Sequence, residues 1–237
     1  MEATSASLWG AFFAIVAANI LLSGDNAVVI AMAARSLPEQ QQKKAVFWGS
    51  AAAIIMRVVL TVVAVQLLKV PYLKLVGGVL LLWIGIQLLV DSDGEGEIQS
   101  HATIGAAIRT ILVADLVMSV DNVLAVAGAA NRAPEQYRLV LLIIGLALSI
   151  PLIIAGSTLL MKIMDRFPVI ITLGAALLGW LAGEMFVSDP ATAAWFHAHI
   201  PEADFIIGGA SAVLVVAVGL WMARRQHGDK AAKSTTA

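Results

Sequence analysis

Apolar residues run along this chain in long stretches, and short polar segments separate them. Each stretch is close to the ~20 residues that an α-helix needs to cross the hydrocarbon core of a membrane. The pattern predicts about seven transmembrane helices. They are expected at about 8–33, 45–68, 71–90, 104–129, 139–161, 167–187 and 204–223. We therefore expect an all-α membrane protein in which residues 1–237 form a single transmembrane domain.

The polar segments refine this picture. An acidic stretch at 91–97 and a longer connection at 188–203 lack apolar periodicity, which is typical of solvated loops. The same criterion predicts a disordered tail over 224–237. The first apolar stretch has no basic segment before it, so we expect no cleaved signal peptide and a retained first helix.

Basic residues in short loops predict the orientation, because such residues are retained on the cytoplasmic side. With the N-terminus outside, most Lys and Arg residues near the ends of the helices fall inside, and few fall outside. The inner set is Arg35, Lys43, Lys44, Arg109, Lys162, Arg166, Arg224, Arg225, Lys230 and Lys233, and the outer set is Lys69, Lys74, Arg132 and Arg138. The predicted location is a bacterial inner (plasma) membrane, with several passes, the N-terminus outside and the C-terminus in the cytoplasm.

Composition narrows the function classes. The chain is 60% hydrophobic and 13% charged, which excludes a water-soluble protein, since such domains are about 25% charged. The formal net charge of −1 gives no basic face for nucleic acid. The chain has no cysteine, so a metal ion would be held by oxygen or imidazole ligands. We expect a lipid bilayer and no nucleic acid among its partners.

The chain also repeats itself. Ser23-Gly-Asp-Asn26 resembles Ser119-Val-Asp-Asn122, and one ungapped shift of about 96 residues relates the two segments. The same shift superposes Pro38-Glu39-Gln40 on Pro134-Glu135-Gln136, Gly49 on Gly145, and Gly78 on Gly174. Each half holds three predicted helices, an odd number, so the second half should cross the membrane in the opposite sense. We expect two inverted repeats, at about 8–90 and 104–187, and an extra C-terminal helix at about 204–223.

The repeated segment places a carboxylate inside an apolar helix in each half. An ionised Asp at that depth costs at least roughly 2.5–3.5 kcal/mol, and such residues are functional by default. Carboxylate, amide and hydroxyl oxygens are the hard ligands that Mg²⁺, Ca²⁺ and Mn²⁺ prefer. The predicted metal-site residues are Asp25, Asn26, Asp115, Asp121 and Asn122, with Asn19, Ser23, Ser119, Arg57 and Glu184 as supporting candidates. No residue is predicted to be catalytic, and no cofactor is expected.

Two of the supporting residues keep alternative interpretations. Arg57, near the middle of the second predicted helix, is a candidate partner for one of the carboxylates, as a counter-ion or a gate. Glu184, near the outer end of the sixth, is either an interfacial carboxylate or a ligand or proton carrier.

With these residues in place, the chain resembles the TerC family of integral membrane proteins, named for tellurite resistance, within a wider superfamily that includes lysine exporters. The resemblance rests on Ser23 to Asn26 and on Asp115-Leu-Val-Met-Ser-Val-Asp-Asn122, and it extends from about residue 8 to about residue 223. It implies a divalent-cation exporter, with Mn²⁺ as the expected substrate. The oxygen donors alone would also accept Ca²⁺ or Mg²⁺. The resemblance also implies that Asp25, Asn26, Asp115, Asp121 and Asn122 handle the ion.

The predicted function is therefore Mn²⁺ efflux, and not an enzymatic activity. An intramembrane aspartyl protease would also need paired aspartates, but the Asp-Asn pairs suit ion ligation better than acid-base catalysis. The alternative is a membrane partner protein that acts in metal or tellurite stress, or in supplying metal to exported enzymes, without transporting an ion. A homodimer or a membrane partner protein is compatible with either function.

Overall fold

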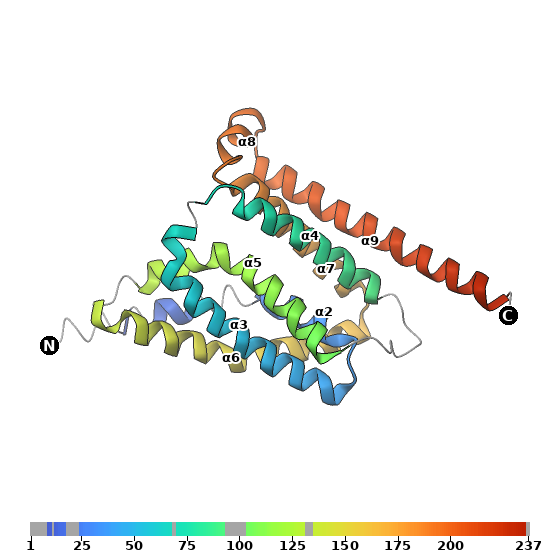
Figure 1. The fold of residues 1–237 in the computed structure, drawn as a ribbon, viewed down its shortest axis with the longest axis horizontal. Coiled ribbons are helices and arrows are strands. Elements are labelled where there is room, and N and C mark those ends of the chain that lie inside the picture. Colours follow the sequence, from blue (N-terminus) through green and yellow to red (C-terminus); the bar gives the residue numbers. More distant parts are fainter. Residues whose placement is uncertain are drawn as a thin grey trace.

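The computed structural model describes residues 9–10, 12–17, 24–67, 70–92, 103–130 and 135–235, and these contain helices and no strand. A helical segment at 12–17 precedes the longer elements. The helices that follow are α2 (Gly24–Arg35), α3 (Glu39–Leu67), α4 (Leu73–Ser92), α5 (Ile104–Ala130), α6 (Glu135–Arg166), α7 (Val169–Ser188), α8 (Ala193–His199) and α9 (Ala203–Thr235) (Figure 1). The predicted all-α class is confirmed.

Several of these helices suit a membrane. Within the described residues, five segments are long and apolar enough to cross one: Glu39–Thr61, Leu73–Asp91, Leu139–Arg166, Val169–Ser188 and Ala203–Gln226. Large apolar side chains on their outer faces are exposed, among them Ile55, Trp83 and Val213, as lipid-facing residues would be. The count of seven helices stays a prediction, because residues 18–23 and the side chains of 120–130 lie outside the described part.

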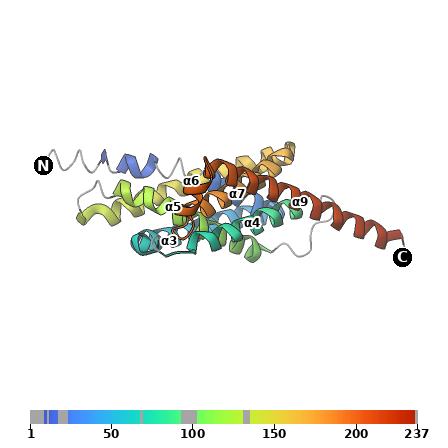
Figure 2. The same ribbon diagram turned by 90° about the horizontal axis from the view of Figure 1, so that it is seen from above.

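Two segments differ from the expected loops. The connection at 188–203 contains the short helix α8, whose Trp195 and Phe196 rings meet edge to face at 5.2 Å. Helix α9 continues to Thr235, although 224–237 was predicted to be disordered. The reason is that Ala, Arg, Gln and Lys are strong helix formers, so a polar sequence does not by itself end a helix. The end of α9 projects beyond the bundle (Figure 2).

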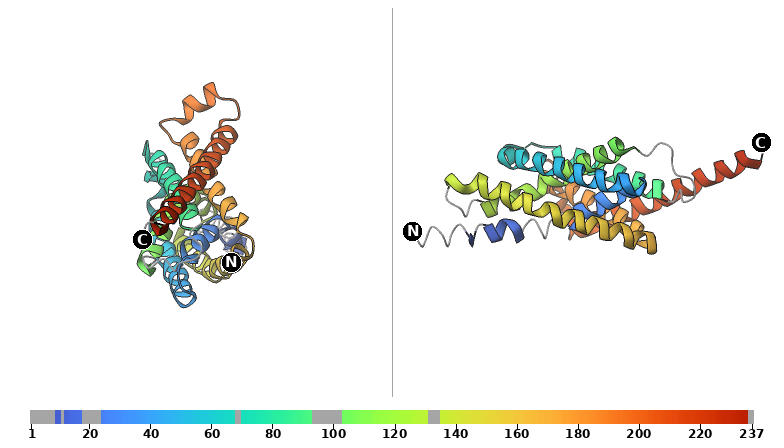
Figure 3. Two further views of the ribbon diagram at one scale, coloured as in Figure 1. Left: turned by 90° about the vertical axis from the view of Figure 1, so that its right-hand side faces the viewer. Right: turned by 90° about the horizontal axis from the view of Figure 1, so that it is seen from below.

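The helices form two groups. α4, α7 and α9 pack against one another, and α2, α3, α5 and α6 form the second group (Figures 1 and 3). Glycines allow α7 and α9 to approach closely: a Cβ atom on Gly183 would lie 2.6 Å from the Cα atom of Gly208. Close backbone approach at small residues is the usual way that membrane helices gain packing energy. This contact fixes α9, the helix outside the repeats, to the second half.

Packing in the second group crosses between the halves. α3 packs mainly against α5, and α6 packs mainly against α2. The shift of about 96 residues exchanges these two pairs, since it carries α2 onto α5 and α3 onto α6. The arrangement is compatible with two related halves, and their inversion stays a prediction.

Polar contacts at the helix ends define two sides of the bundle. The Arg35 Nε atom at the end of α2 lies 3.3 Å from an Asp165 carboxylate oxygen at the end of α6. On the other side, Asp189 follows α7 and Tyr72 directly precedes α4. The Asp189 carboxylate accepts a hydrogen bond from the Tyr72 backbone N–H at 2.9 Å. These contacts agree with the predicted order of crossings, and the choice of cytoplasmic side stays a prediction.

Candidate cation site

The first carboxylate of the candidate site lies at the start of a described helix. Asp25 lies in α2, whose described residues begin at Gly24. Its Oδ1 atom accepts a hydrogen bond from the Asn26 backbone N–H at 2.7 Å. Asp25 is partly buried, whereas the next residue, Asn26, is 3% exposed. The repeated Asp-Asn pair therefore lies in α2, with the Asn26 side chain buried in the bundle.

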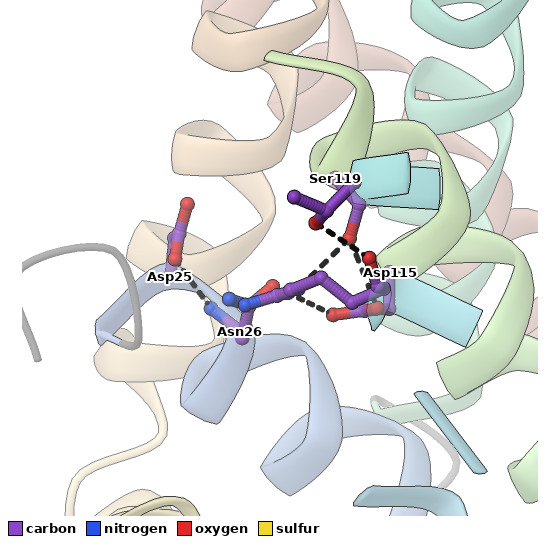
Figure 4. Close-up of polar contacts among 6 residues, drawn as sticks. Asp25, Asn26, Asp115 and Ser119 are labelled. Atoms are coloured by element: carbon purple, nitrogen blue, oxygen red, sulfur yellow. Dashed lines mark hydrogen bonds and ion pairs between the residues drawn. The ribbon is translucent and has the colours of Figure 1, made fainter. Parts of the chain in front are cut away.

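A small cavity lies between α2 and α5. Its volume is about 10 Å³, close to the smallest space that can hold one water molecule. Two polar side chains face it, Asn26 from α2 and Asp115 from α5, and Figure 4 shows these two residues near each other. The rest of its lining is Val29, Ile30, Ile111 and Met118. The cavity thus joins oxygen-bearing residues from both halves inside an apolar wall.

Asp115 is held by a basic side chain from α3. Arg57, 3% exposed, forms a salt bridge through Nη2 with the Asp115 Oδ1 atom. The Arg57 Nε atom donates to the Ser119 Oγ atom at 3.0 Å, and that hydroxyl donates to Asp115 Oδ2 at 3.1 Å. The three side chains therefore form a closed ring of polar contacts (Figure 4). A buried ion pair needs such additional hydrogen bonds, because desolvation otherwise exceeds the attraction between the charges.

Asp25 is next to this region in the chain, since it directly precedes Asn26, which lines the same cavity as Asp115. Asp115 is the charged residue in the lining of the cavity, and Arg57 contacts it from α3. One turn further along α3, the Thr61 hydroxyl donates to the Arg57 backbone carbonyl oxygen at 2.7 Å. The Arg57 side chain reaches across to α5 and is held there by Asp115 and Ser119.

The structure brings together five of the sequence candidates: Asp25, Asn26, Arg57, Asp115 and Ser119. Asn19 and Ser23 lie outside the described residues. The backbone of Asp121 and Asn122 lies in α5, but their side chains are outside the described part. In the described ranges, no three His, Asp or Glu side chains gather closely enough to hold a metal ion.

Glu184 lies apart from this group. Its carboxylate accepts a hydrogen bond from the Trp180 indole N–H at 2.7 Å, one turn earlier on α7. α7 packs mainly against α9 and α4, so Glu184 belongs to the other helix group. Of its two interpretations, this contact favours a carboxylate with a local partner.

Sequence reasoning missed the apolar wall of the cavity. Val29 and Ile30 follow Asn26 by three and four residues, and Ile111 and Met118 flank Asp115 by four and three. These are the spacings that place residues on one face of a helix. The signal was therefore present, but nothing in the spacing indicates that the two faces meet.

The chain was compared with known proteins. The profile of the integral membrane protein TerC family matches residues 4–227. An uncharacterized membrane protein of Bacillus subtilis (strain 168), YjbE, is 43% identical over 175 residues, which cover 74% of this chain and 78% of that protein. A second one from the same organism, YceF, is 26% identical over 209 residues, covering 84% of this chain and 77% of its own length. No solved structure matches. The chain therefore belongs to the TerC family of integral membrane proteins.

Proposed function

We propose that this protein exports a divalent metal ion, Mn²⁺, across the bacterial inner membrane. The observation that carries the proposal is the cavity between α2 and α5, which Asn26 and Asp115 line from opposite halves of the chain. Polar residues are costly inside an apolar bundle, and a pathway for an ion is the usual reason for their presence.

The donor chemistry supports a hard cation. Asp25 and Asn26 offer carboxylate and amide oxygens from α2, and Asp121 and Asn122 repeat the same pair of residue types in α5. Mn²⁺, Mg²⁺ and Ca²⁺ all accept such ligands, and cavity size and ligand number select among them. The small cavity favours an ion that has lost most of its water.

The proposed mechanism is alternating access. Mn²⁺ enters from the cytoplasm, is coordinated near the middle of the bundle, and leaves on the outer side as the two halves rock. The seam between α2 and α5 suits this motion, because the ion would contact both halves at once. No phosphate-binding Gly-rich loop with Lys is present in the sequence, so the energy source we propose is a proton gradient or the membrane potential.

The competing function is a membrane partner protein that supports metal or tellurite stress responses, or the metallation of exported enzymes, without moving an ion. That function needs a surface for another protein, and it gives no reason for a buried Asn and Asp around one cavity. The two functions differ in a measurable way, since only a transporter changes the metal content of cells or vesicles by itself.

The test measures manganese inside cells that carry or lack the protein and are challenged with excess Mn²⁺. We expect expression to lower the intracellular manganese and the toxicity, and we expect Asp25→Asn and Asp121→Asn to abolish both effects. Asp165→Asn is the matched control, because Asp165 is an exposed carboxylate at the far end of α6. Purified wild-type protein in vesicles should also move Mn²⁺ without a partner. Expression that leaves both manganese content and toxicity unchanged would refute export.

A further inference from the structure

We infer that Asp115 is not a ligand for the transported ion but the fixed counter-ion of Arg57, and that this neutral pair sets the net charge of the cation site. The inference rests on the proposed function, and it assigns a positioning role to a residue that the sequence predicts as a ligand. Its starting point is the ring formed by Arg57, Asp115 and Ser119 (Figure 4).

The ring engages both oxygens of the carboxylate. Oδ1 contacts the Arg57 guanidinium and Oδ2 accepts from the Ser119 hydroxyl, while the Arg57 Nε atom returns to the same hydroxyl. All three side chains are buried, with exposed fractions of 3%, 7% and 0% for Arg57, Asp115 and Ser119. The Arg57 guanidinium has almost no exposed surface to turn toward, so it stays beside the Asp115 carboxylate. The contacts therefore favour a permanent pair.

The helices that carry the pair are also packed tightly. A Cβ atom on Gly49 of α3 would lie 2.8 Å from the Ile111 Cδ1 atom of α5, one turn before Asp115. Such close packing between Gly49 and Ile111 leaves little freedom for α3 to slide along α5. The guanidinium and the carboxylate are thus held at one register by the backbone as well as by their own bonds.

The internal repeat supplies an independent argument. Under the shift of about 96 residues, Arg57 corresponds to Ile153, and Asp115 corresponds to Asn19. The two related positions in the other halves are therefore uncharged. The repeat keeps neither the arginine nor the aspartate, and the two charged residues contact each other. A carboxylate that binds the ion does not need an arginine beside it. A carboxylate that neutralises an arginine must contact that arginine. Asp25 and Asp121, by contrast, are the carboxylates that the repeat keeps in both halves.

The charge of the site follows from this assignment. Arg57 cancels Asp115, so the two repeated aspartates that the proposed function assigns to the ion, Asp25 and Asp121, would give a net charge of two negative units. That charge matches a divalent cation. Without Arg57 the same residues would carry three negative charges, and without Asp115 they would carry one. Removal of both Arg57 and Asp115 would leave the net charge at two negative units.

The test compares Mn²⁺ binding to purified protein in lipid nanodiscs for the wild type, Arg57→Gln, Asp115→Asn and the double variant Arg57→Gln/Asp115→Asn. The matched control is Arg35→Gln/Asp165→Asn, which removes another Arg–Asp pair between helices, at the end of the bundle. Thermal unfolding of each variant is recorded in the same nanodiscs. If a single variant fails to fold, the comparison of the wild type with the double variant is decisive.

We expect Asp115→Asn to weaken Mn²⁺ binding by about tenfold or more and Arg57→Gln to strengthen it, since one unit charge near a dication has an effect of at least this size. The double variant should bind Mn²⁺ within about threefold of the wild type, because its site again carries two negative charges. The control pair should leave binding unchanged.

A double variant that loses as much binding as Asp115→Asn would overturn the inference, because Asp115 would then be a ligand. In that case the wild type still binds and exports Mn²⁺, and the proposed function stands. A wild-type protein that binds no Mn²⁺ would refute both the proposed function and this inference. The two failures are therefore distinct in the same experiment.

Discussion

Asp189 joins the end of α7 to the start of α4, and its removal should destabilise the bundle measurably. Its side chain has no exposed surface, and its carboxylate accepts from the backbone N–H groups of Tyr72, Lys74, Leu75 and Ala191 at 2.9, 3.1, 3.3 and 2.8 Å. The turn that it holds has Tyr72 at a φ of 67°, a left-handed conformation that is unfavourable for a bulky residue. The carboxylate thus compensates for a strained turn and for the free N–H groups of a helix start.

The cost of Asp189→Ala follows from these contacts. Loss of a helix N-cap costs about 0.5–2 kcal/mol, and hydrogen bonds to a charged group are worth roughly 1.5–3 kcal/mol each. Water at the membrane surface can replace some of them, so we expect a loss of about 2–4 kcal/mol. For a chain of 150–250 residues this corresponds to a melting temperature lower by roughly 4–15 °C.

The assay is thermal unfolding of purified protein in one detergent, followed by circular dichroism. Ser188→Ala is the matched control, since Ser188 only accepts an exposed hydrogen bond from the Lys74 ammonium at 3.1 Å. That control should stay within about 0.5 kcal/mol of the wild type. If Asp189→Ala melts at the same temperature as Ser188→Ala, the carboxylate does not stabilise the turn and the reasoning is wrong.

Three further predictions concern the pH dependence of Asp189, the close approach of Gly183 to α9, and Glu184. Burial alone would raise the pKa of Asp189, but its four backbone donors lower that pKa below its ordinary value of 3.8, so the folded state favours the charged form. Its stabilising effect is therefore complete above about pH 4 and is lost as the pH falls through the lowered pKa. When the melting temperature is measured against pH in acid, the wild type should show a step that Asp189→Asn lacks. Gly183→Ala should destabilise by roughly 1–3 kcal/mol, because its Cβ would meet the backbone of α9, whereas Gly105→Ala, with nothing within 4 Å, should be neutral or stabilising in the same melts. Glu184→Gln should retain Mn²⁺ export and the contact with Trp180; loss of export with intact folding would make Glu184 part of the pathway.

The positions of the long helices could be predicted from the apolar stretches. The fourth stretch was expected at about 104–129 and α5 is Ile104–Ala130, and the sixth was expected at about 167–187 and α7 is Val169–Ser188. Hydrophobic length determines these elements, so single-sequence reasoning works. It fails at polar ends: α3 begins at Glu39, six residues before the expected stretch, because the Gln and Lys residues there are good helix formers.

The candidate site could be predicted in part. The intramembrane Asp and Asn residues stand out in the sequence because apolar helices rarely contain them. Arg57 stood out as well, but the sequence left open which carboxylate it meets. That choice depends on α3 packing against α5, a long-range contact that no local spacing encodes. The apolar wall of the cavity was missed for the same reason.

The exchange of partners between the halves has a consequence for how the chain is made. Among the described helices, α3 packs mainly on α5 and α2 packs mainly on α6, so their main contacts run between the halves. During synthesis, the first three helices leave the ribosome with faces that only later helices can cover. An isolated first half should therefore be a substrate for membrane proteases, and co-expression of the second half as a separate chain should protect it.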